Sequence, residues 1–238
     1  MPLNKPIRAV IFDLFHTLVS LEVSKAPGPT TAELLGIDPE EWNRHWLADP
    51  SDYVLGLAPI ELPFCRIARQ LNPKVTEEQI QKALKIRRAR FRHTLLNAEP
   101  ETIEGIKALK AMGFKTGLIS NCGWDEISAW DESPFSPLFE TVLFSCAVKL
   151  KKPDPEIYRL AALHLGVLPA NCLFVGNGGS QELTGACRAG MTPVLLTRHL
   201  EIIKPERIIE ILPEARIVIR TVRDLTLILL GKTGFIFH

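Results

Sequence analysis

The chain has 238 residues, of which 46% are hydrophobic and 23% charged, an ordinary composition for a soluble globular protein of one domain with an insertion or two small domains. Lys and Arg number 28 against 27 Asp and Glu, so no bulk charge attracts nucleic acid or a membrane surface. The sequence has neither a basic-then-apolar leader nor an apolar run of bilayer length, and we expect a cytoplasmic protein. Five scattered cysteines without a CxxC pair favour reduced thiols.

The first predicted strand begins at Ile7 and leads to a single acidic residue, Asp13. A short apolar run that ends in one carboxylate is typical of a buried parallel strand with a charged side chain at its carboxyl end. Ligands bind at that edge of open α/β sheets. Asp13 is therefore a candidate nucleophile or metal ligand, with the alternative that it only closes the turn after the strand.

The segment from residue 21 to residue 96 is predicted to be helical. Helices are expected over 31–35, 39–47, 60–71 and 76–95, and the last of these begins with a capping box of Thr76 and Gln79. Its second half, from Lys82 to His93, is rich in Lys and Arg. We expect these side chains to form a solvated face, with the alternative that one or two of them help to hold an anionic substrate.

After about residue 97, predicted strands and helices alternate. Strands are expected over 114–120, 140–145, 172–176, 192–196 and 215–220, and helices over 102–112, 154–165, 181–189 and 222–230. This alternation predicts a three-layer α/β fold with a Rossmann-like parallel sheet. The carboxyl ends of its strands would bring Asp13, Ser120 and Asn177 to one edge.

Four short motifs follow one another in the order found in a known family. Asp13 opens Asp-Leu-Phe-His-Thr, Ser120 ends a strand, Lys152 opens Lys-Pro-Asp-Pro, and Asn177 and Glu182 lie in Gly-Asn-Gly-Gly-Ser-Gln-Glu. The chain thereby resembles the haloacid dehalogenase-like (HAD) hydrolases, subfamily I with a helical cap. The resemblance implies a core of residues 1–20 and 97–238, and an inserted all-helical cap of residues 21–96 that shapes the substrate pocket.

The resemblance also implies roles for individual residues. Asp13 is the nucleophile that forms a covalent intermediate, Ser120 donates a hydrogen bond to the transferring group, and Lys152 adds a positive charge beside both. Backbone amides after Asp13 and around Asn121 complete the cradle for the substrate. His16 stands where the family usually has glycine, and is either a substituted loop residue or a group that moves a proton near the substrate.

A magnesium ion is also implied by the resemblance. Its ligands would be Asp13, the backbone carbonyl of Phe15, Asn177 and Glu182, and such hard oxygen ligands suit Mg²⁺. Asn177 replaces the usual Asp and brings no charge, so we expect weakened metal binding. Glu182 either holds a metal-bound water or pairs with Lys152. Phe15 replaces the second Asp of phosphatases, whose general acid–base catalysis is typically worth ~10²–10⁴-fold.

Three functions remain open at this point. The favoured one is a phosphatase-like hydrolase of a small phosphorylated metabolite, with weak or atypical metal dependence. The second is a metal-independent 2-haloacid dehalogenase, a branch with an aromatic residue at the position of Phe15 and a cap arginine, for which Arg44 is the candidate. The third is a catalytically impaired binding protein with the HAD fold. The expected partner is a small anionic molecule contacting Phe15, His16, Asn121 and Arg44, with no nucleic acid or membrane, and the oligomeric state is open.

Overall fold

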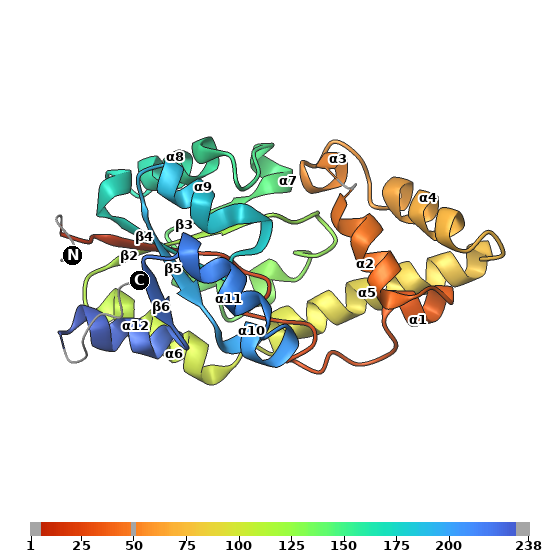
Figure 1. Ribbon diagram of the computed structural model, residues 1–238, viewed down its shortest axis with the longest axis horizontal. Helices are drawn as coiled ribbons and strands as arrows, with labels where there is room; N and C mark the ends of the chain where they lie inside the picture. Colours follow the sequence, from red (N-terminus) through yellow and green to blue (C-terminus); the bar gives the residue numbers. More distant parts are fainter. Residues whose placement is uncertain (1–5, 49–50, 232–238) are drawn as a thin grey trace.

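The computed structural model of the protein describes residues 6–48 and 51–231. The strands among these residues form one parallel sheet in the order β3-β2-β1-β4-β5-β6 (Figure 1). They are β1 (Ala9–Phe12), β2 (Lys115–Ser120), β3 (Thr141–Phe144), β4 (Cys172–Gly176), β5 (Thr192–Leu196) and β6 (Ile217–Ile219). The predicted parallel α/β sheet is confirmed, and β6 is shorter than expected.

Helices cover both faces of the sheet because the central strand is apolar on both sides. Val10 and Phe12 of β1 belong to one hydrophobic cluster, and Ala9 and Ile11 belong to a second cluster on the opposite face. Helices α6 and α12 pack in the first cluster, and α8, α9 and α11 pack in the second. The core helices are α6 (Pro100–Ala111), α7 (Ser145–Val148), α8 (Pro155–His164), α9 (Glu182–Arg188), α10 (Arg198–Ile203), α11 (Arg207–Ile211) and α12 (Val222–Leu229).

Between β1 and α6 the chain forms a helical cap, drawn in orange and yellow in Figure 1. Its buried side chains form a hydrophobic cluster of their own, with Trp42 and Phe64 among its members. The cap helices are α1 (Thr31–Leu35), α2 (Pro39–Ala48), α3 (Ser51–Val54), α4 (Glu61–Leu71) and α5 (Glu77–Leu96). They lie inside the segment 21–96 predicted as the cap, and α3 was not expected. Parts of the predicted domains, residues 1–5, 49–50 and 232–238, lie outside the described residues.

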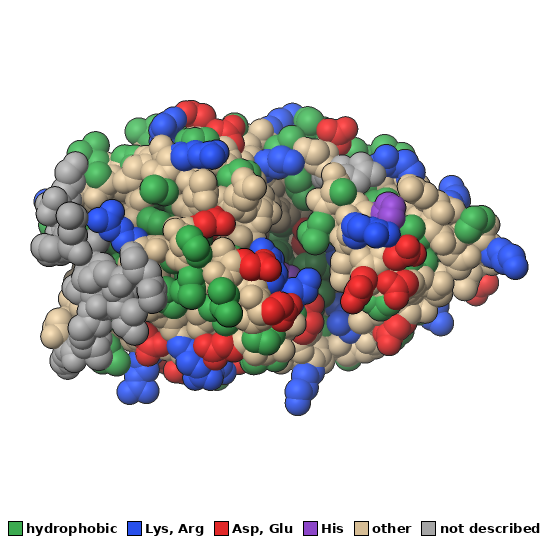
Figure 2. All heavy atoms as spheres, in the orientation of Figure 1, with side chains coloured by type: hydrophobic (Ala, Val, Ile, Leu, Met, Phe, Trp, Pro, Cys, Tyr) green, Lys and Arg blue, Asp and Glu red, His purple; other side chains and the backbone are tan. Residues whose placement is uncertain are grey.

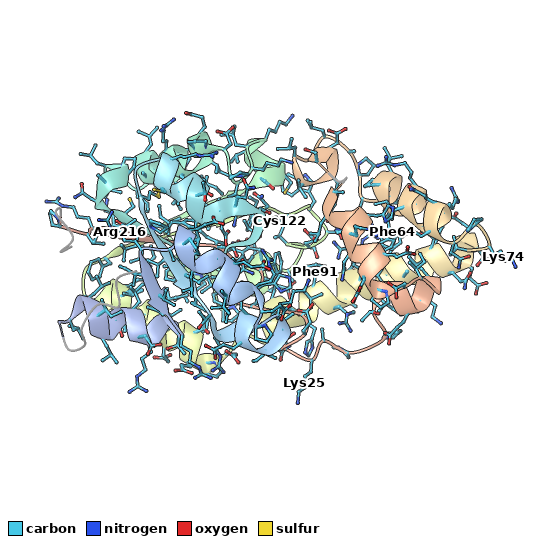
Figure 3. All side chains as sticks on the ribbon, viewed as in Figure 1. Lys25, Phe64, Lys74, Phe91, Cys122 and Arg216 are labelled. Atoms are coloured by element: carbon cyan, nitrogen blue, oxygen red, sulfur yellow. The ribbon has the colours of Figure 1, made fainter. Side chains whose placement is uncertain are left out.

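Helix α5 connects the cap to the core. It begins with the predicted capping box, in which Thr76 accepts from the backbone amide of Gln79 and the Gln79 side chain accepts from that of Thr76. Such caps typically stabilise a helix by ~1 kcal/mol. At its other end, α5 carries Phe91 to the junction between cap and core, where Figure 3 labels it.

Short 3₁₀ helices join several of these elements. They are η1 (Trp130–Glu132), η2 (Ser136–Leu138), η3 (Pro169–Asn171), η4 (Gly179–Gln181) and η5 (Leu212–Glu214). Within the described part of the chain, no helix has the length and apolar character needed to cross a membrane. All five cysteines are free thiols, as expected.

Candidate active site

The predicted nucleophile lies at the carboxyl end of the central strand. The backbone amide of Asp13 donates to the carbonyl of Val175 at 2.9 Å, which fixes the residue just beyond β1 beside β4. Its side chain is only 8% exposed. Thr17 donates its hydroxyl to Asp13 Oδ2 at 2.6 Å, so one carboxylate oxygen is held from within its own loop.

Lys152 contacts two buried carboxylates. Its Nζ donates to Asp13 Oδ1 and to Glu182 Oε2, and all three side chains are at least nine-tenths buried. The pairing of Glu182 with Lys152, one of two expected roles, is confirmed. Burial raises the pKa of Glu182 to about 7, and repulsion from Asp13 adds to this shift. Burial alone would lower the pKa of Lys152, but the attraction of Asp13 and Glu182 outweighs it and raises that pKa.

Asn121 holds the loop that carries Lys152. Its Oδ1 accepts from the backbone amide of Lys152 at 2.8 Å, and its Nδ2 donates to the backbone carbonyl of Lys152 at 2.8 Å. Because both ends of the amide are used in this way, the Asn121 side chain orients the lysine rather than a substrate. Its neighbour Ser120 ends β2 and is buried at the same edge of the sheet.

The strand register explains why these residues meet. Phe12 of β1 lies opposite Leu118 of β2 and Val175 of β4. Asp13, Ser120 and Asn177 therefore lie at the carboxyl ends of neighbouring strands, at one edge of the sheet, as the sequence predicts. Ser120, Asn177 and Asp13 come from segments more than fifty residues apart, and the parallel topology brings them together.

The side-chain oxygens expected to bind magnesium already accept hydrogen bonds within the protein. Asn177 Oδ1 accepts from the amide of Gly179 at 3.0 Å, and Glu182 Oε1 accepts from the amide of Gly178 at 3.0 Å. Glu182 Oε2 accepts a hydrogen bond from Lys152 Nζ, which also donates to Asp13 Oδ1. The described residues contain no group of three or more His, Cys, Asp or Glu side chains placed to hold a metal ion. In this arrangement the residues do not fit the expected Mg²⁺ site, because a cation there would displace Lys152.

Phe15 and His16, two residues expected to contact the substrate, lie in the loop after β1. The ring of Phe15 packs edge-on against Phe91 of the cap, with centroids 5.1 Å apart. His16 adopts a left-handed backbone conformation with φ of 63°, and its Nδ1 lies 3.5 Å from Glu22. Phe15 thus faces the cap junction, while the His16 side chain turns toward Glu22 and is 42% exposed.

Arg44 is not brought to the site. Its side chain is 68% exposed and forms a 3.2 Å ion pair with Glu41 of the same helix. The expectation that Arg44 binds the substrate carboxylate is therefore not supported by its placement. Helix α2 turns this side chain toward solvent.

A buried cluster at the junction was missed by sequence reasoning. Arg87 of α5 donates to Glu126, and its Nε lies 3.9 Å from Asp125. Tyr53 of α3 donates to Asp125 at 2.6 Å. The guanidinium of Arg87 also lies over the ring of Phe91, 4.4 Å from its centroid. We call Tyr53, Arg87, Asp125 and Glu126 the junction cluster, since it joins two cap helices to the core loop after β2.

The other arginines of the basic run have partners other than Asp13. Arg88 pairs with Glu61 at 2.6 Å, and Arg92 pairs with Glu132 at 2.6 Å on the surface. Arg90 donates to two backbone carbonyls of the segment before α1. Most of this run is therefore a solvated, ion-paired face as expected, and Arg87, whose side chain is only 11% exposed, is the exception. Figure 2 shows a hollow on the surface between cap and core.

The fold, the four motifs and their convergence at one edge agree with a family match. A family model described as haloacid dehalogenase-like hydrolase matches residues 7–190. The chain belongs to the haloacid dehalogenase-like hydrolases. HAD hydrolases act on small molecules, but the family includes enzymes of different chemistry.

The individual relatives include both phosphatases and dehalogenases. Phosphoglycolate phosphatase of Salmonella choleraesuis is 30% identical over 80% of this chain and 81% of its own length. (S)-2-haloacid dehalogenase 1 of a Pseudomonas species is 27% identical over 81% of this chain and 86% of its own length. Three further relatives are 32–33% identical, but the chain spans only 45–64% of their length.

Solved structures support the same fold. The L-2-haloacid dehalogenase of Xanthobacter autotrophicus superposes with a TM-score of 0.64 at 21% identity, covering 95% of this chain and all of that one. At this identity the likeness concerns the fold alone. The comparisons therefore establish a HAD hydrolase and leave the choice between phosphatase and dehalogenase open.

Proposed function

We propose that this HAD hydrolase is a phosphatase of small anionic phosphate esters, with Asp13 as its nucleophile. The contact between Lys152 and Asp13 carries the proposal, because it holds one buried positive charge against the attacking carboxylate. Asp13 attacks phosphorus, and the bond from phosphorus to the leaving oxygen breaks. Water then attacks the phosphorus of the aspartyl phosphate, which releases phosphate and restores Asp13.

Charge compensation in this reaction falls to Lys152 and Ser120. Phosphoryl transfer spreads negative charge over the equatorial oxygens, which need nearby positive charge and hydrogen-bond donors. The raised pKa of Lys152 keeps its amine charged at neutral pH. Ser120 ends β2 at the same edge, and its hydroxyl would donate to one of these oxygens. We assign no step to a metal ion.

Phe15 determines which esters would react fastest. An aromatic ring cannot give a proton to the leaving oxygen, so the leaving group takes its proton from solvent. The missing general acid would cost ~10²–10⁴-fold with a poor leaving group. The proposed enzyme is therefore fastest on esters whose alcohols are acidic, and slow on simple alkyl phosphates.

The placement of the cap arginines favours phosphate esters over haloacids. A haloacid dehalogenase needs a cap cation for the substrate carboxylate. Arg44 is exposed and paired with Glu41. Arg87 faces the junction but is already held by Glu126 and lies near Asp125. An arginine neutralised by carboxylates attracts a second anion poorly.

A 2-haloacid dehalogenase remains the second candidate, because side chains expected to bind a metal ion instead form hydrogen bonds within the protein. Asn177 and Glu182 accept hydrogen bonds from the backbone amides of Gly179 and Gly178. This arrangement suits an enzyme that works without a metal ion. In that reaction Asp13 attacks the carbon that bears the halogen, and halide leaves with the electrons of the broken bond. Water then cleaves the resulting ester.

Parallel assays separate these functions. The purified protein and Asp13→Asn are tested for phosphate release from a panel of phosphate esters, with and without Mg²⁺, and for halide release from 2-haloacids. Phosphate release that depends on Asp13 supports the phosphatase. Halide release without phosphate release supports the dehalogenase. If neither product is released, the result favours a binding protein with the HAD fold.

A further inference from the structure

The short loop that follows β2 connects Lys152 to the cap through hydrogen bonds at both of its ends. At its start, the Asn121 side chain is bonded to the backbone amide and to the backbone carbonyl of Lys152, each at 2.8 Å. At its end, Glu126 accepts a hydrogen bond from Arg87 of cap helix α5. We infer that docking of the cap positions Lys152 against Asp13, with Arg87 and Glu126 as the positioning residues.

Glu126 uses its two carboxylate oxygens in different directions. Its Oε1 accepts from Arg87, and its Oε2 accepts from the backbone amide of Gly123 at 2.9 Å. The amide of Glu126 donates back to the carbonyl of Gly123 at 3.2 Å. These two bonds close a tight turn, so the position of the Glu126 carboxylate fixes that of Gly123, the second residue after Asn121. A displacement of this carboxylate therefore moves the backbone that carries Asn121.

The cap also contacts this loop from α3. The amide of Cys122, a residue that Figure 3 labels, donates to Ser145 Oγ at 3.0 Å, and the Ser145 hydroxyl donates to the carbonyl of Val54 at 2.6 Å. Gly123 lies against the ring of Tyr53, where a Cβ atom would be 2.1 Å from the nearest ring carbons. Two cap helices therefore hold neighbouring residues of one loop.

Arg87 keeps the Glu126 carboxylate charged. Both side chains are 11% exposed, and burial raises the pKa of Glu126, while the charge of Arg87 opposes that rise. Asp125 adds a second carboxylate, with its Oδ2 3.9 Å from Arg87 Nε. Removal of the arginine would leave two adjacent carboxyl groups without this cation, and a neutral carboxyl accepts the amide hydrogen of Gly123 less strongly than a carboxylate does.

The inference rests on the proposed roles of Asp13 and Lys152. When the contact at Glu126 is weakened, Asn121 shifts and its two bonds to the lysine backbone lengthen. The amine of Lys152 then lies less often beside Asp13, where it would stabilise the charge that develops in the transition state. We expect kcat to fall by about tenfold, with KM nearly unchanged.

Glu126→Gln tests this expectation without changing the size of the side chain. Glutamine has a single side-chain oxygen, so its NH₂ group must face either the amide of Gly123 or the guanidinium of Arg87, and both are donors. One of the two bonds is therefore lost. The kcat for p-nitrophenyl phosphate should fall by about tenfold. A wild-type kcat in the folded variant would overturn the inference.

Tyr53→Phe is the matched control from the same cluster. It removes the hydroxyl that donates to Asp125 at 2.6 Å and keeps the ring that packs on Gly123. Both substitutions weaken a contact between cap and core, but only Glu126→Gln reaches the turn that carries Asn121. Tyr53→Phe should therefore keep a kcat near that of the wild type. Equal losses in the two variants would contradict a specific role of Glu126.

Ser145→Ala is a second test that leaves the charged cluster intact. It removes the acceptor of the Cys122 amide and the donor to Val54, which are the other connection from the cap to this loop. It should lower kcat in the same direction, and it keeps the inference testable if Glu126→Gln does not fold. A folded Ser145→Ala protein with the wild-type kcat would contradict the inference.

A double-mutant cycle shows whether Glu126 acts through Asn121. Asn121→Ala removes both bonds to the backbone of Lys152 and should lower kcat by itself. Addition of Glu126→Gln should then lower kcat no further, because the path to the lysine is already broken. A Glu126 that only stabilises the fold would give losses that multiply, which would overturn the positioning role.

Hydrogen exchange keeps the test independent of the proposed reaction. The backbone amide hydrogen of Lys152, which donates to Asn121, should exchange faster in Glu126→Gln than in the wild type and in Tyr53→Phe. If exchange changes as expected but Asp13-dependent turnover is absent in the wild type, the proposed function fails and the positioning role stands. Unchanged exchange in Glu126→Gln would overturn the positioning role.

Discussion

Phe15 and Phe91 meet edge to face, with ring centroids 5.1 Å apart and ring planes at 86°. The first follows Asp13 by two residues, and the second lies on the long cap helix α5. Such aromatic pairs contribute about 0.5–1.5 kcal/mol beyond their buried area. The position that carries a proton donor in many related phosphatases therefore serves here as a contact with the cap.

Phe15→Asp should give the protein the general acid that it lacks. We expect hydrolysis of alkyl phosphates to rise relative to p-nitrophenyl phosphate, by up to ~10²–10⁴-fold if the carboxyl reaches the leaving oxygen. The ratio of kcat/KM for the two substrates measures this effect. Phe15→Asn is the control for loss of the ring. An equal ratio in both variants would show that this position does not reach the leaving group.

Asn177→Asp should create affinity for Mg²⁺. The carboxylate has the same shape as the amide and can still accept from Gly179, so the loop is kept while one negative charge is added. Calorimetric titration should show tighter Mg²⁺ binding, and phosphate release should become more dependent on Mg²⁺. Asn177→Ser is the control without added charge. The phosphatase proposal would be weakened if neither binding nor activity increased in Asn177→Asp.

Arg87→Met should destabilise the protein strongly. It leaves Glu126 and Asp125 buried without their cation, and removal of one partner from a buried pair typically costs 3–5 kcal/mol. Urea denaturation measures the free energy of unfolding. Arg92→Met breaks an exposed pair with Glu132 and should change little. Similar effects of the two substitutions would mean that the junction cluster does not hold the cap to the core.

Glu182 should make stability depend on pH near neutrality. Its pKa in the folded protein is about 7, above the ordinary value of 4.5, because burial and Asp13 disfavour its charge. The folded state therefore binds this proton more tightly than the unfolded state. The resulting stability is fully present below about pH 4.5 and is lost as pH rises through 7.

The measurement compares the wild type with Glu182→Gln. The free energy of unfolding of the wild type should fall relative to the variant between pH 4.5 and pH 8. His199 has the opposite effect, since burial lowers its pKa, but it is present in both proteins and cancels in the difference. Parallel curves for the two proteins would contradict the assigned pKa of Glu182.

Much of the fold follows from local patterns in the sequence. Apolar strands that alternate with amphipathic helices predicted the sheet, and the Thr76 capping box marked the start of α5. Short helices such as α3, α7 and α10 were missed, because four to six residues carry too little periodicity. Their placement depends on tertiary contacts, such as that of Tyr53 in α3 with Asp125.

The site was predictable where residues follow strands and unpredictable where two distant segments meet. Asp13, Ser120 and Asn177 share an edge because parallel strands align their carboxyl ends. Nothing local in the sequence pairs Arg87 with Glu126, which lies thirty-nine residues away across the junction. Arg44 lies in a predicted cap helix, but the sequence does not tell which face of α2 is buried.

The decisive experiment for Asp13 as the nucleophile of a phosphatase compares phosphate release by the wild type and by Asp13→Asn. We expect the wild type to release phosphate from p-nitrophenyl phosphate with little dependence on added Mg²⁺. Asp13→Asn, which keeps the size of the side chain but removes the attacking carboxylate, should release none above background. Equal rates in the two proteins, or no release by the wild type from any ester tested, would contradict this role of Asp13.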